Sequence, residues 1–401
     1  MSETECWLSI IGIGEDRREA LPPASLAALA HADHVFGAPR HLALADLDED
    51  PRAQVWPVPF SVKPVLALRG KRVAVLASGD PFWFGAGASL AVHLSPSEWR
   101  AFPAPSTFSL AAARLGWRIE ETACLGLHAA PFERLVPVMA QGARAICLLR
   151  DGAAADALAD WLTAQGFGDS TCHVLEALGG LDERIRTRRA DAAPLDDVRA
   201  PVAMAVAFAG NAGLPRASGL PDTLFTHDGQ ITKRPVRALT LSALAPRAGE
   251  VLWDLGAGSG SIAIEWCLAG GRAIAVERHP ERVETIRANA ARFGLSHKIE
   301  VIAADTAQLP DLPSPALPSP DAVFIGGGAN EALIARLWAM LPAGTRIVVN
   351  AVTLETEAVL IAAHARHGGD LLRIDLAHAR PLGRMQGWEP VRPVVQWSVT
   401  R

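Results

Sequence analysis

The chain of 401 residues has few cysteines, no excess of basic residues and no long apolar run, and each lack excludes a class of protein. Its cysteines are widely spaced and include no CxxC pair: Cys6, Cys124, Cys147, Cys172 and Cys267. The odd number and the wide spacing argue against a disulfide framework or a zinc site. We therefore expect structural thiols in a reducing compartment.

The charge and hydropathy argue against two kinds of partner. The formal net charge is −5, whereas nonspecific binding to nucleic acid or to a membrane surface usually needs a basic excess. No apolar run reaches the roughly 18 residues of a membrane span. The start, Met1-Ser2-Glu3-Thr4-Glu5, is acidic and lacks the basic region of a signal peptide. We expect a cytoplasmic protein that binds neither nucleic acid nor membrane.

Half of the residues are apolar, and the length favours two or three domains. In the first half, apolar strands are expected at Trp7–Ile13, Arg72–Ala77 and Ala143–Leu149. Helical patterns alternate with them, beginning after Pro22-Pro23 and again at Ala86–Leu94. This alternation predicts βαβ units and a mostly parallel sheet.

The periodicity fails between Phe208 and Thr232, where turn-forming residues are dense. We place one domain at 1–212, a linker at 213–231 and a second domain at 232–401. The segment Pro310–Pro320 is expected to be an exposed loop. A second α/β pattern starts after the linker, with strands expected at Glu250–Leu255, Arg272–Glu277, Ile299–Ala303, Ala322–Ile325 and Thr345–Asn350.

The most informative segment is Val251–Glu265, an apolar run that ends in Asp254 and continues with Gly256, Gly258 and Gly260. Glycine permits a close backbone approach and a positive φ, and a helix N-terminus offers unpaired N–H groups. This strand, turn and helix pattern predicts a loop that binds a nucleotide cofactor.

Two acidic residues follow at the ends of the next two strands. Glu277 lies twenty-one residues after Gly256, an offset from which a carboxylate can accept both ribose hydroxyls. Asp305 follows the third strand and can accept from an adenine amino group. The spacing is neither the GxGxxG of dinucleotide sites nor the GxxxxGK(S/T) of triphosphate sites, which favours an adenosyl ligand without phosphates. Alternatively, Glu277 and Asp305 only cap helices.

The sequence from roughly Gly219 onward resembles the class I S-adenosylmethionine-dependent methyltransferases, and more closely the cobalamin-pathway branch that methylates and decarboxylates a precorrin. Besides the glycine loop, the resemblance rests on Ile231–Arg237, Ala322–Gly328 and Val348–Glu355. Ile325-Gly326-Gly327-Gly328 stands where DNA amino-methyltransferases carry an Asp/Asn-Pro-Pro-Tyr/Phe motif. A nucleic-acid amino group is therefore not the expected acceptor.

The resemblance implies a Rossmann-like domain with one S-adenosylmethionine site. Thr232 would contact the cofactor, the glycine loop would wrap its methionine portion, Glu277 would hold the ribose and Asp305 would lie near the adenine. Because the sulfonium supplies its own leaving group, we expect no metal. The implied contacts are Thr232, Asp254, Gly256, Ala257, Gly258, Ser259, Gly260, Glu277 and Asp305.

The implied substrate, a precorrin, is a polycarboxylate that basic side chains can meet through charge-assisted hydrogen bonds. For each cation the alternative is an ordinary solvated surface side chain. Arg384–Trp388 is expected to form a loop that walls the pocket. The substrate-binding candidates are Lys233, Arg237, Asn350 and Arg384, with Arg278 and Arg380 as further cations.

The first half contains a second loop at the carboxyl end of a strand, Ala77-Ser78-Gly79-Asp80-Pro81, where open α/β sheets bind ligands. Alone it can equally be a helix start, with Asp80 as the N-cap and Pro81 at the first helical position. Pro105–Gly116 supplies another polar helix start.

Together with Ile11–Gly14, Ala32–Gly37 and Leu175–Arg184, these segments resemble the tetrapyrrole methylase family over about Trp7 to Ala209. That family folds as two α/β subdomains with the cofactor in the cleft between them. The implied cofactor contacts are Gly12, Gly79, Asp80, Pro81, Ser106 and Thr107.

This half departs from the family pattern in two places. Gly14-Glu15-Asp16-Arg17 stands where Gly-x-Gly-Pro-Gly is usual, and Leu127-His128-Ala129-Ala130 replaces a His-Gly-Arg. His128 is either a residue that binds or deprotonates substrate or a satisfied histidine at a strand end. Arg184–Arg189 is either a solvated face or a clamp for carboxylates.

Two such halves occur in this order in fused cobalamin-pathway enzymes. The resemblance implies methylation of precorrin-6B (precorrin-6Y) at carbon 5 by the first half and at carbon 15 by the second, with decarboxylation of the ring C acetate to give precorrin-8. The tetrapyrrole is its own nucleophile, and no catalytic acid or base is assigned. A homodimer or tetramer is expected by the same analogy. The alternatives are an RNA or small-molecule methyltransferase with an accessory domain, and a non-catalytic regulatory protein that binds S-adenosylmethionine.

Overall fold

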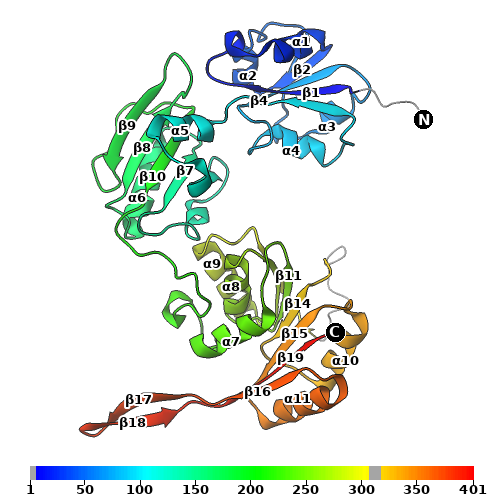
Figure 1. Cartoon of the computed structure of the whole chain (residues 1–401), viewed down its shortest axis with the longest axis vertical. Coiled ribbons are helices and arrows are strands. Elements are labelled where there is room, and N and C mark those ends of the chain that lie inside the picture. The colour runs from blue at the N-terminus through cyan, green and yellow to red at the C-terminus, as the bar shows by residue number, and fades with distance from the viewer. Residues whose placement is uncertain (1–5, 307–317) are drawn as a thin grey trace. The chain divides into compact units, whose positions relative to one another are not determined.

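The computed structural model describes residues 6–306 and 318–401 (Figure 1). The acidic start Met1–Glu5 and most of the expected loop Pro310–Pro320 lie outside these residues. The chain divides into two compact units. Unit 1 comprises Met1–Phe132 and Val138–Gly213, and unit 2 comprises Glu133–Pro137 and Leu214–Arg401.

The first subdomain of unit 1 is a parallel sheet whose described strands have the order β3-β2-β4-β1-β5. Side chains that alternate along β1 reach opposite faces: Ile11 and Ile13 pack with α1 and α2, and Leu8 and Ile10 pack with α3 and α4. The elements are β1 (Leu8–Ile13), α1 (Pro23–His31), β2 (His34–Gly37), α2 (Pro39–Leu44), β3 (Ala53–Val55), α3 (Lys63–Leu66), β4 (Val73–Ser78), α4 (Ala86–Ala91) and β5 (Trp99–Phe102).

The second subdomain of unit 1 is a mixed sheet with the order β6-β7-β10-β8-β9. Only the β6–β7 pair is parallel among its described strand pairs, because β10 runs antiparallel between β7 and β8 and β9 folds back on β8. The elements are α5 (Thr107–Leu115), β6 (Ala123–Gly126), β7 (Arg144–Leu148), α6 (Ala153–Ala164), β8 (Thr171–Glu176), β9 (Arg184–Arg189) and β10 (Val202–Ala207).

Unit 2 is built on one sheet whose described strands have the order β13-β12-β11-β14-β15-β19-β16, parallel except for β19. Its elements are α7 (Arg234–Leu244), β11 (Val251–Leu255), α8 (Ser261–Leu268), β12 (Arg272–Glu277), α9 (Pro280–Arg292), β13 (Ile299–Ala303), β14 (Ala322–Ile325), α10 (Glu331–Met340), β15 (Arg346–Ala351), α11 (Leu354–His367), β16 (Asp370–Ile374), β17 (Ala377–Leu382), β18 (Met385–Pro390) and β19 (Val394–Thr400). Short 3₁₀ helices in the chain occur at Arg18–Ala20, Ile119–Glu121, Phe132–Leu135 and Asp222–Leu224.

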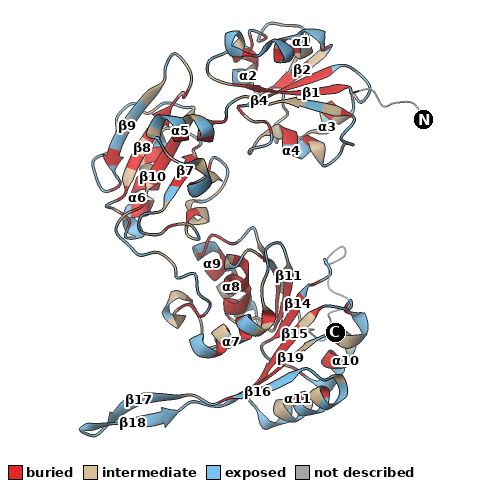
Figure 2. Cartoon of the chain, viewed as in Figure 1, coloured by how far each residue is buried: buried red, intermediate tan, exposed pale blue. Residues whose placement is uncertain are grey.

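Helices cover both faces of the unit 2 sheet (Figure 1). Leu252 packs with apolar side chains of α7, α8 and α9. Trp253 and Leu255, on the opposite face of β11, pack with those of α10 and α11. The central strands are therefore buried on both faces, as a parallel sheet between helices requires (Figure 2). The carboxyl ends of β11, β12, β13 and β14 meet at one edge of this sheet.

The expected strands of both halves are confirmed, most of them within one or two residues. The helical spacing of Val283, Ile286 and Ala290 places them on the buried face of α9, and Gly294 follows this helix with φ +68°. The prediction of mostly parallel pairing is wrong for the second subdomain of unit 1. It is also wrong to expect Arg384–Trp388 to be a loop, because these residues form the tip and the second strand of the hairpin β17–β18.

No helix in the described part of the chain is both long and apolar enough to cross a membrane.

Candidate functional sites in the two units

The loop between β11 and α8 has a backbone that only glycine adopts without strain. Gly256, Gly258 and Gly260 have φ angles of +71°, +58° and +74°. A Cβ on Gly256 would lie 3.0 Å from the carbonyl oxygen of Gly327, and one on Gly260 would lie 2.9 Å from Ile286 Cγ2. The loop is therefore bare backbone at the carboxyl end of the first strand, as the sequence predicted.

The carboxylate of Glu277 holds this loop. Glu277 ends β12 and is 4% exposed. Its Oε2 accepts from the amide of Gly258 at 3.0 Å, and its Oε1 accepts from the amide of His279 at 3.0 Å. His279 is the N-cap of α9, so Glu277 stabilises a helix start in addition to lying beside the glycine loop.

Asp254 leaves a buried acceptor without a partner. The residue is 1% exposed, and its Oδ2 accepts from the amide of Ala263 at 3.2 Å, while Oδ1 has no hydrogen-bond partner. Burial raises the pKa of Asp254 to about 7; the Ala263 N–H opposes this shift and the charge of Glu277 adds to it. The hydroxyl of Ser259 is also buried without a partner. Unsatisfied buried polar atoms beside a bare loop fit a polar ligand.

Asn289 also belongs to this site, although it was not among the residues expected from the sequence. It lies on the buried face of α9, and its Nδ2 donates to the carbonyl oxygens of Ser259 at 3.0 Å and Thr226 at 2.9 Å. Its Oδ1 accepts from the amide of Thr226 at 2.9 Å. An asparagine between the buried Ile286 and Ala290 on a helix is the signal that could have revealed it.

Arg237 is engaged inside unit 2. It is 0% exposed, and its guanidinium donates to Glu265 at 2.5 Å, to Asp222 at 3.0 Å and to the backbone. The backbone acceptors are the carbonyl oxygens of Thr232, at 2.5 Å, and Leu220. Since this residue fastens the segment before α7 to α8, the expected contact with a substrate carboxylate does not fit its position.

Asn350 is likewise engaged inside the unit. Its Nδ2 donates to Thr240 Oγ1 at 2.9 Å, and its Oδ1 accepts from Gln396 Nε2 at 2.9 Å. Gln396 also donates to Thr240 Oγ1 at 3.0 Å, which closes a buried triangle between α7, β15 and β19. The triangle fixes these elements to one another, and Asn350 has little capacity left for a substrate.

The other expected residues of unit 2 are more accessible. Thr232 is half-buried, and Lys233 is the exposed N-cap of α7. Asp305 is half-buried and forms an ion pair with Arg278 at 3.8 Å. Arg384 is exposed at the turn of the β17–β18 hairpin, and Arg380 forms an ion pair with Glu389 at 3.4 Å in the same hairpin.

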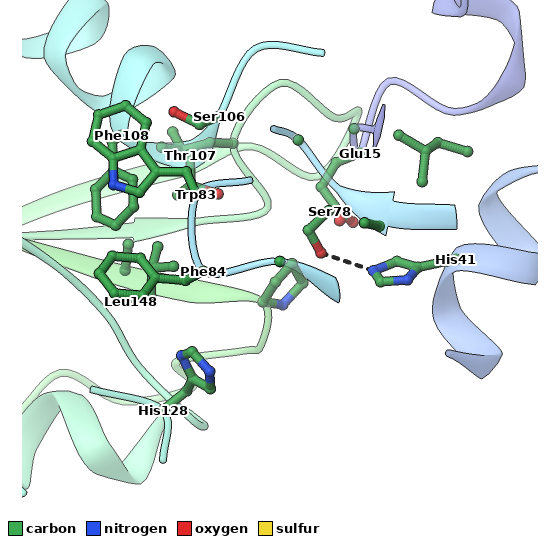
Figure 3. Close-up of a pocket in the computed structure, with 18 of the residues that line it drawn as sticks. Glu15, His41, Ser78, Trp83, Phe84, Ser106, Thr107, Phe108, His128 and Leu148 are labelled. Carbon is green, nitrogen blue, oxygen red and sulfur yellow. Dashed lines mark hydrogen bonds between the residues drawn. The ribbon is translucent and has the colours of Figure 1, made fainter. Parts of the chain in front are cut away.

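Unit 1 contains a cavity of about 590 Å³ that is lined by residues of both its subdomains (Figure 3). Of the expected cofactor contacts, Gly79, Ser106 and Thr107 line it. Ser106 is the N-cap of α5, where its Oγ accepts from the amide of Ser109 at 3.1 Å. Trp83, Phe84 and Phe108 form an aromatic wall (Figure 3).

Gly12, Asp80 and Pro81 lie outside the described lining of this cavity. A Cβ on Gly12 would lie 1.9 Å from the carbonyl oxygen of Gly79, so Gly12 permits the loop after β4 to pack on β1. Asp80 accepts from the amide of Phe82 at 2.8 Å in a turn. The interpretation of Asp80 as a helix cap is wrong, because α4 begins at Ala86 with Gly85 as its N-cap.

A polar cluster lines the same cavity and comes from three segments of the first subdomain. The hydroxyl of Ser78 lies 2.8 Å from His41 Nε2 and accepts from Arg40 Nη2 at 2.9 Å. Arg40 also forms an ion pair with Glu15. Burial, and then the charge of Arg40, lower the pKa of His41 to about 4.

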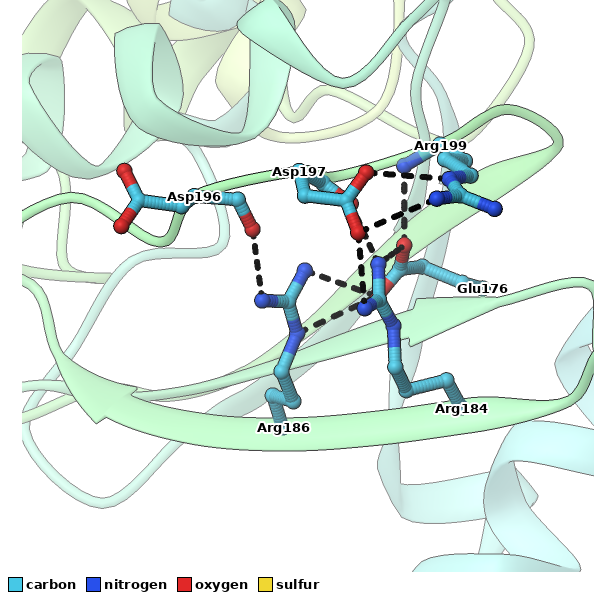
Figure 4. Close-up of polar contacts among 6 residues, drawn as sticks. All are labelled: Glu176, Arg184, Arg186, Asp196, Asp197 and Arg199. Carbon is cyan, nitrogen blue, oxygen red and sulfur yellow. Dashed lines mark hydrogen bonds and ion pairs between the residues drawn. The ribbon is translucent and has the colours of Figure 1, made fainter.

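The basic run Arg184–Arg189 forms strand β9, and two of its arginines, Arg184 and Arg186, are bound to a buried carboxylate of the protein (Figure 4). Arg184 donates to the buried Glu176 at 2.7 Å, and Arg186 donates to the same carboxylate at 3.0 Å. Although burial favours the neutral form, these hydrogen bonds and the amide of Arg199 hold the pKa of Glu176 below its usual value. The network ties β9 and the loop before Pro201 to β8.

Among residues 6–306 and 318–401, no three or more His, Cys, Asp or Glu side chains are arranged to hold a metal ion.

Comparison with known proteins agrees with the two folds. A model of the tetrapyrrole (corrin/porphyrin) methylases matches residues 8–194, and a model of the precorrin methyltransferase domain matches residues 223–401. The C-terminal domain of a precorrin-6Y C5,15-methyltransferase from Rhodobacter capsulatus is 57% identical, with a TM-score of 0.45, and the match covers 47% of this chain and 100% of that one.

Two curated relatives match the whole chain. A precorrin-6Y C(5,15)-methyltransferase (decarboxylating) from Sinorhizobium is 47% identical over 98% of this chain and 96% of the relative. One of the same description from Mycobacterium tuberculosis (strain CDC 1551 / Oshkosh) is 41% identical over 98% and 99%.

The chain is thus an enzyme of the methyltransferase class, with a tetrapyrrole methylase domain followed by a precorrin methyltransferase domain. It belongs to the family of the decarboxylating precorrin-6Y C(5,15)-methyltransferases of cobalamin biosynthesis. The alternatives of an RNA or small-molecule methyltransferase and of a non-catalytic regulatory protein are therefore not retained.

Proposed function

We propose that this enzyme methylates precorrin-6B (precorrin-6Y) at carbons 5 and 15 and removes the carboxyl group of the ring C acetate, giving precorrin-8. The observation that carries the proposal is the whole-chain match to relatives of that description. We assign carbon 5 to an N-terminal domain at 1–212 and carbon 15 with decarboxylation to a C-terminal domain at 232–401, joined by 213–231.

We place one S-adenosylmethionine site in each domain. When bound, the cofactor supplies an electrophilic methyl group on a sulfonium that is its own leaving group. In unit 2 the unpaired Oδ1 of Asp254, the unpaired hydroxyl of Ser259 and the bare backbone of Gly256–Gly260 support such a site. Glu277 and Asp305 follow the next two strands of the same sheet edge, where Glu277 is assigned to the ribose and Asp305 to the adenine.

In unit 1 the second site is the cavity lined by Gly79, Ser106 and Thr107. Its size and its aromatic wall suit an adenosyl ligand, because small-molecule sites are mostly apolar concavities of about 300–1,000 Å³. Gly12 contributes by permitting the close packing of the loop after β4.

The chain's own contribution is to position and neutralise the substrate. Lys233, Thr232 and Arg384 are exposed or half-buried in unit 2, and the two cations remain the candidates to bind precorrin carboxylates. The buried Arg237 and Asn350 instead fix the elements around the site. Because the tetrapyrrole is an electron-rich nucleophile, orientation supplies much of the rate.

We further propose a homo-oligomer in the cytoplasm. All five cysteines are unpaired, which supports a reducing compartment. Light scattering of the purified chain tests the oligomeric state.

The reaction is tested with the full chain, precorrin-6B and S-adenosylmethionine carrying a carbon-13 methyl group. We expect two labelled methyl signals in the product and one carbon dioxide per turnover. Glu277→Ala should lose carbon dioxide release and the carbon 15 methyl group, because the glycine loop loses its support at Gly258. Glu284→Gln, at an exposed position of α9, is the matched control. No label transfer by the unaltered chain would contradict the proposed function.

A further inference from the structure

Four side chains of unit 1, which the cofactor assignment leaves unused, form a hydrogen-bonded chain in the wall of the cavity. Glu15 pairs with Arg40, and Arg40 donates to Ser78. Figure 3 shows the contact of Ser78 with His41. All four line the cavity, and Glu15 belongs to the loop that departs from the family's glycine pattern. These four hydrogen-bonded side chains, which include one acid and one cation, thus face the aromatic wall of the cavity.

The direction of these hydrogen bonds follows from the chemistry of the groups. A guanidinium has only donors, so the 2.9 Å contact from Arg40 Nη2 occupies a lone pair of Ser78 Oγ. Arg40 Nη2 also lies 3.4 Å from His41 Nε2, and since a guanidinium only donates, this nitrogen is an acceptor and takes the Ser78 hydrogen, 2.8 Å away. Burial, and then the charge of Arg40, lower the pKa of His41 to about 4, so its Nε2 is unprotonated at physiological pH and acts as a weak base.

The reaction proposed for unit 1 needs a proton acceptor. When a trigonal C–H carbon of a conjugated macrocycle receives a methyl group, it carries both the methyl group and the hydrogen. Conjugation returns only when that C–H bond breaks, its electron pair enters the π system and the proton leaves. The methylated macrocycle is cationic, so a weak base suffices.

We propose that Ser78 and His41 form the proton acceptor of the methyl transfer in unit 1. The proton passes from the methylated carbon to Ser78 Oγ, and Ser78 passes its own hydroxyl proton to His41 Nε2. Glu15 and Arg40 are positioning residues that hold the Ser78 oxygen and balance each other's charge. This assignment rests on the proposed methylation of carbon 5 and names the groups that complete it.

His128 is the rival acceptor, because it also lines the cavity. It is exposed, and none of the described side chains or backbone groups makes a hydrogen bond to its imidazole. The His41 ring, in contrast, is held against a hydroxyl. The fixed orientation of the His41 ring favours His41 over His128 as the proton acceptor.

The test compares His41→Gln and Ser78→Ala with the unaltered full chain, with precorrin-6B as the substrate. In both variants kcat for carbon 5 methylation should fall about 100-fold while KM is unchanged, since loss of acid–base catalysis costs roughly 10²–10⁴ in rate. Deuterium at carbon 5 should slow both variants more than the unaltered chain, because C–H cleavage limits them. A purely structural defect would not raise this isotope effect. His93→Gln, exposed at the end of α4, is the matched control.

These measurements distinguish a failure of the proposed function from a failure of the proton-acceptor assignment. If the unaltered chain places no methyl group on carbon 5, the proposed function fails. If it does so and His41→Gln keeps its kcat and isotope effect, only the proton acceptor is wrong. Loss of kcat in His128→Gln alone would also overturn the assignment. Ser78→Ala at an exposed strand end guards against a folding defect in the His41 variant.

Discussion

At the scale of single residues, the two units use buried polar atoms in different ways. In unit 2 Asp254 keeps an unpaired oxygen beside the glycine loop, whereas Glu277 uses both of its oxygens on backbone amides. Two acids at the ends of neighbouring strands thus have separate tasks. Asp254 keeps an oxygen for a ligand, and Glu277 shapes the loop that receives it while its remaining lone pairs can accept the ribose hydroxyls.

The buried Asp254 makes the stability of the cofactor-free chain depend on pH. Its pKa is about 7 in the folded state and 3.8 as the ordinary value, so between these values the folded state holds a proton that the unfolded state has lost. The free energy of unfolding therefore falls as the pH rises from about 4 to about 7, by up to about 4 kcal/mol for this group. The measurement is urea unfolding at several pH values.

Asp254→Asn is the matched variant for this prediction. Asn cannot ionise. The free energy of unfolding of this variant, relative to that of the unaltered chain, should therefore rise steadily across the same pH range. A constant difference between the two proteins from pH 4 to pH 7 would show that Asp254 does not titrate in this window.

At the scale of elements, the segment before α7 is held by a buried ion pair. Arg237 joins Glu265 of α8 and Asp222, while Glu265 also accepts from the amides of Gly219 at 2.6 Å and Leu220 at 2.9 Å. Arg237→Met leaves the Glu265 carboxylate buried without its cation. We expect a loss of about 3–5 kcal/mol in the free energy of unfolding of unit 2.

Urea unfolding followed by tryptophan fluorescence measures this loss. Arg287→Met removes an exposed pair on α9 and should cost less than about 1 kcal/mol. Equal losses in the two variants would mean that the buried pair does not anchor the segment.

The elements also show what the sequence could predict. The glycine loop, Glu277 and α9 were predictable because local patterns specify them: apolar strands, a positive-φ loop and a helical period. The role of Arg237 was not, because its partners Asp222 and Glu265 meet it only through tertiary packing. Likewise, β9 reads as a charged surface until Glu176 is seen to be buried beneath Arg184 and Arg186 (Figure 4).

The hairpin β17–β18 was not predicted from the sequence for a different reason. All but one of its residues are exposed, so it lacks the alternation of buried and exposed side chains that marks a strand against a core. The cavity of unit 1 was foreseen only in part. Gly79, Ser106 and Thr107 line it, but the Ser78–His41 pair joins two segments that no local pattern connects.

At the scale of the whole molecule, one chain combines two α/β architectures of different topology. Unit 1 pairs a parallel sheet with a mixed sheet, and the described part of unit 2 has a seven-stranded sheet in which only β19 runs antiparallel to its neighbours, together with the antiparallel hairpin β17–β18. Each has polar groups and glycines at strand ends, where such sheets bind ligands. We therefore expect each unit to bind its own cofactor.

Calorimetric titration of the full chain with S-adenosylhomocysteine measures how many ligands each chain binds. Gly258→Val places a branched side chain at a φ of +58° in the unit 2 loop, and it should leave the unit 1 site intact. The expected stoichiometry is two ligands per chain for the unaltered protein and one for this variant. One ligand per unaltered chain, or two undiminished sites in the variant, would contradict it.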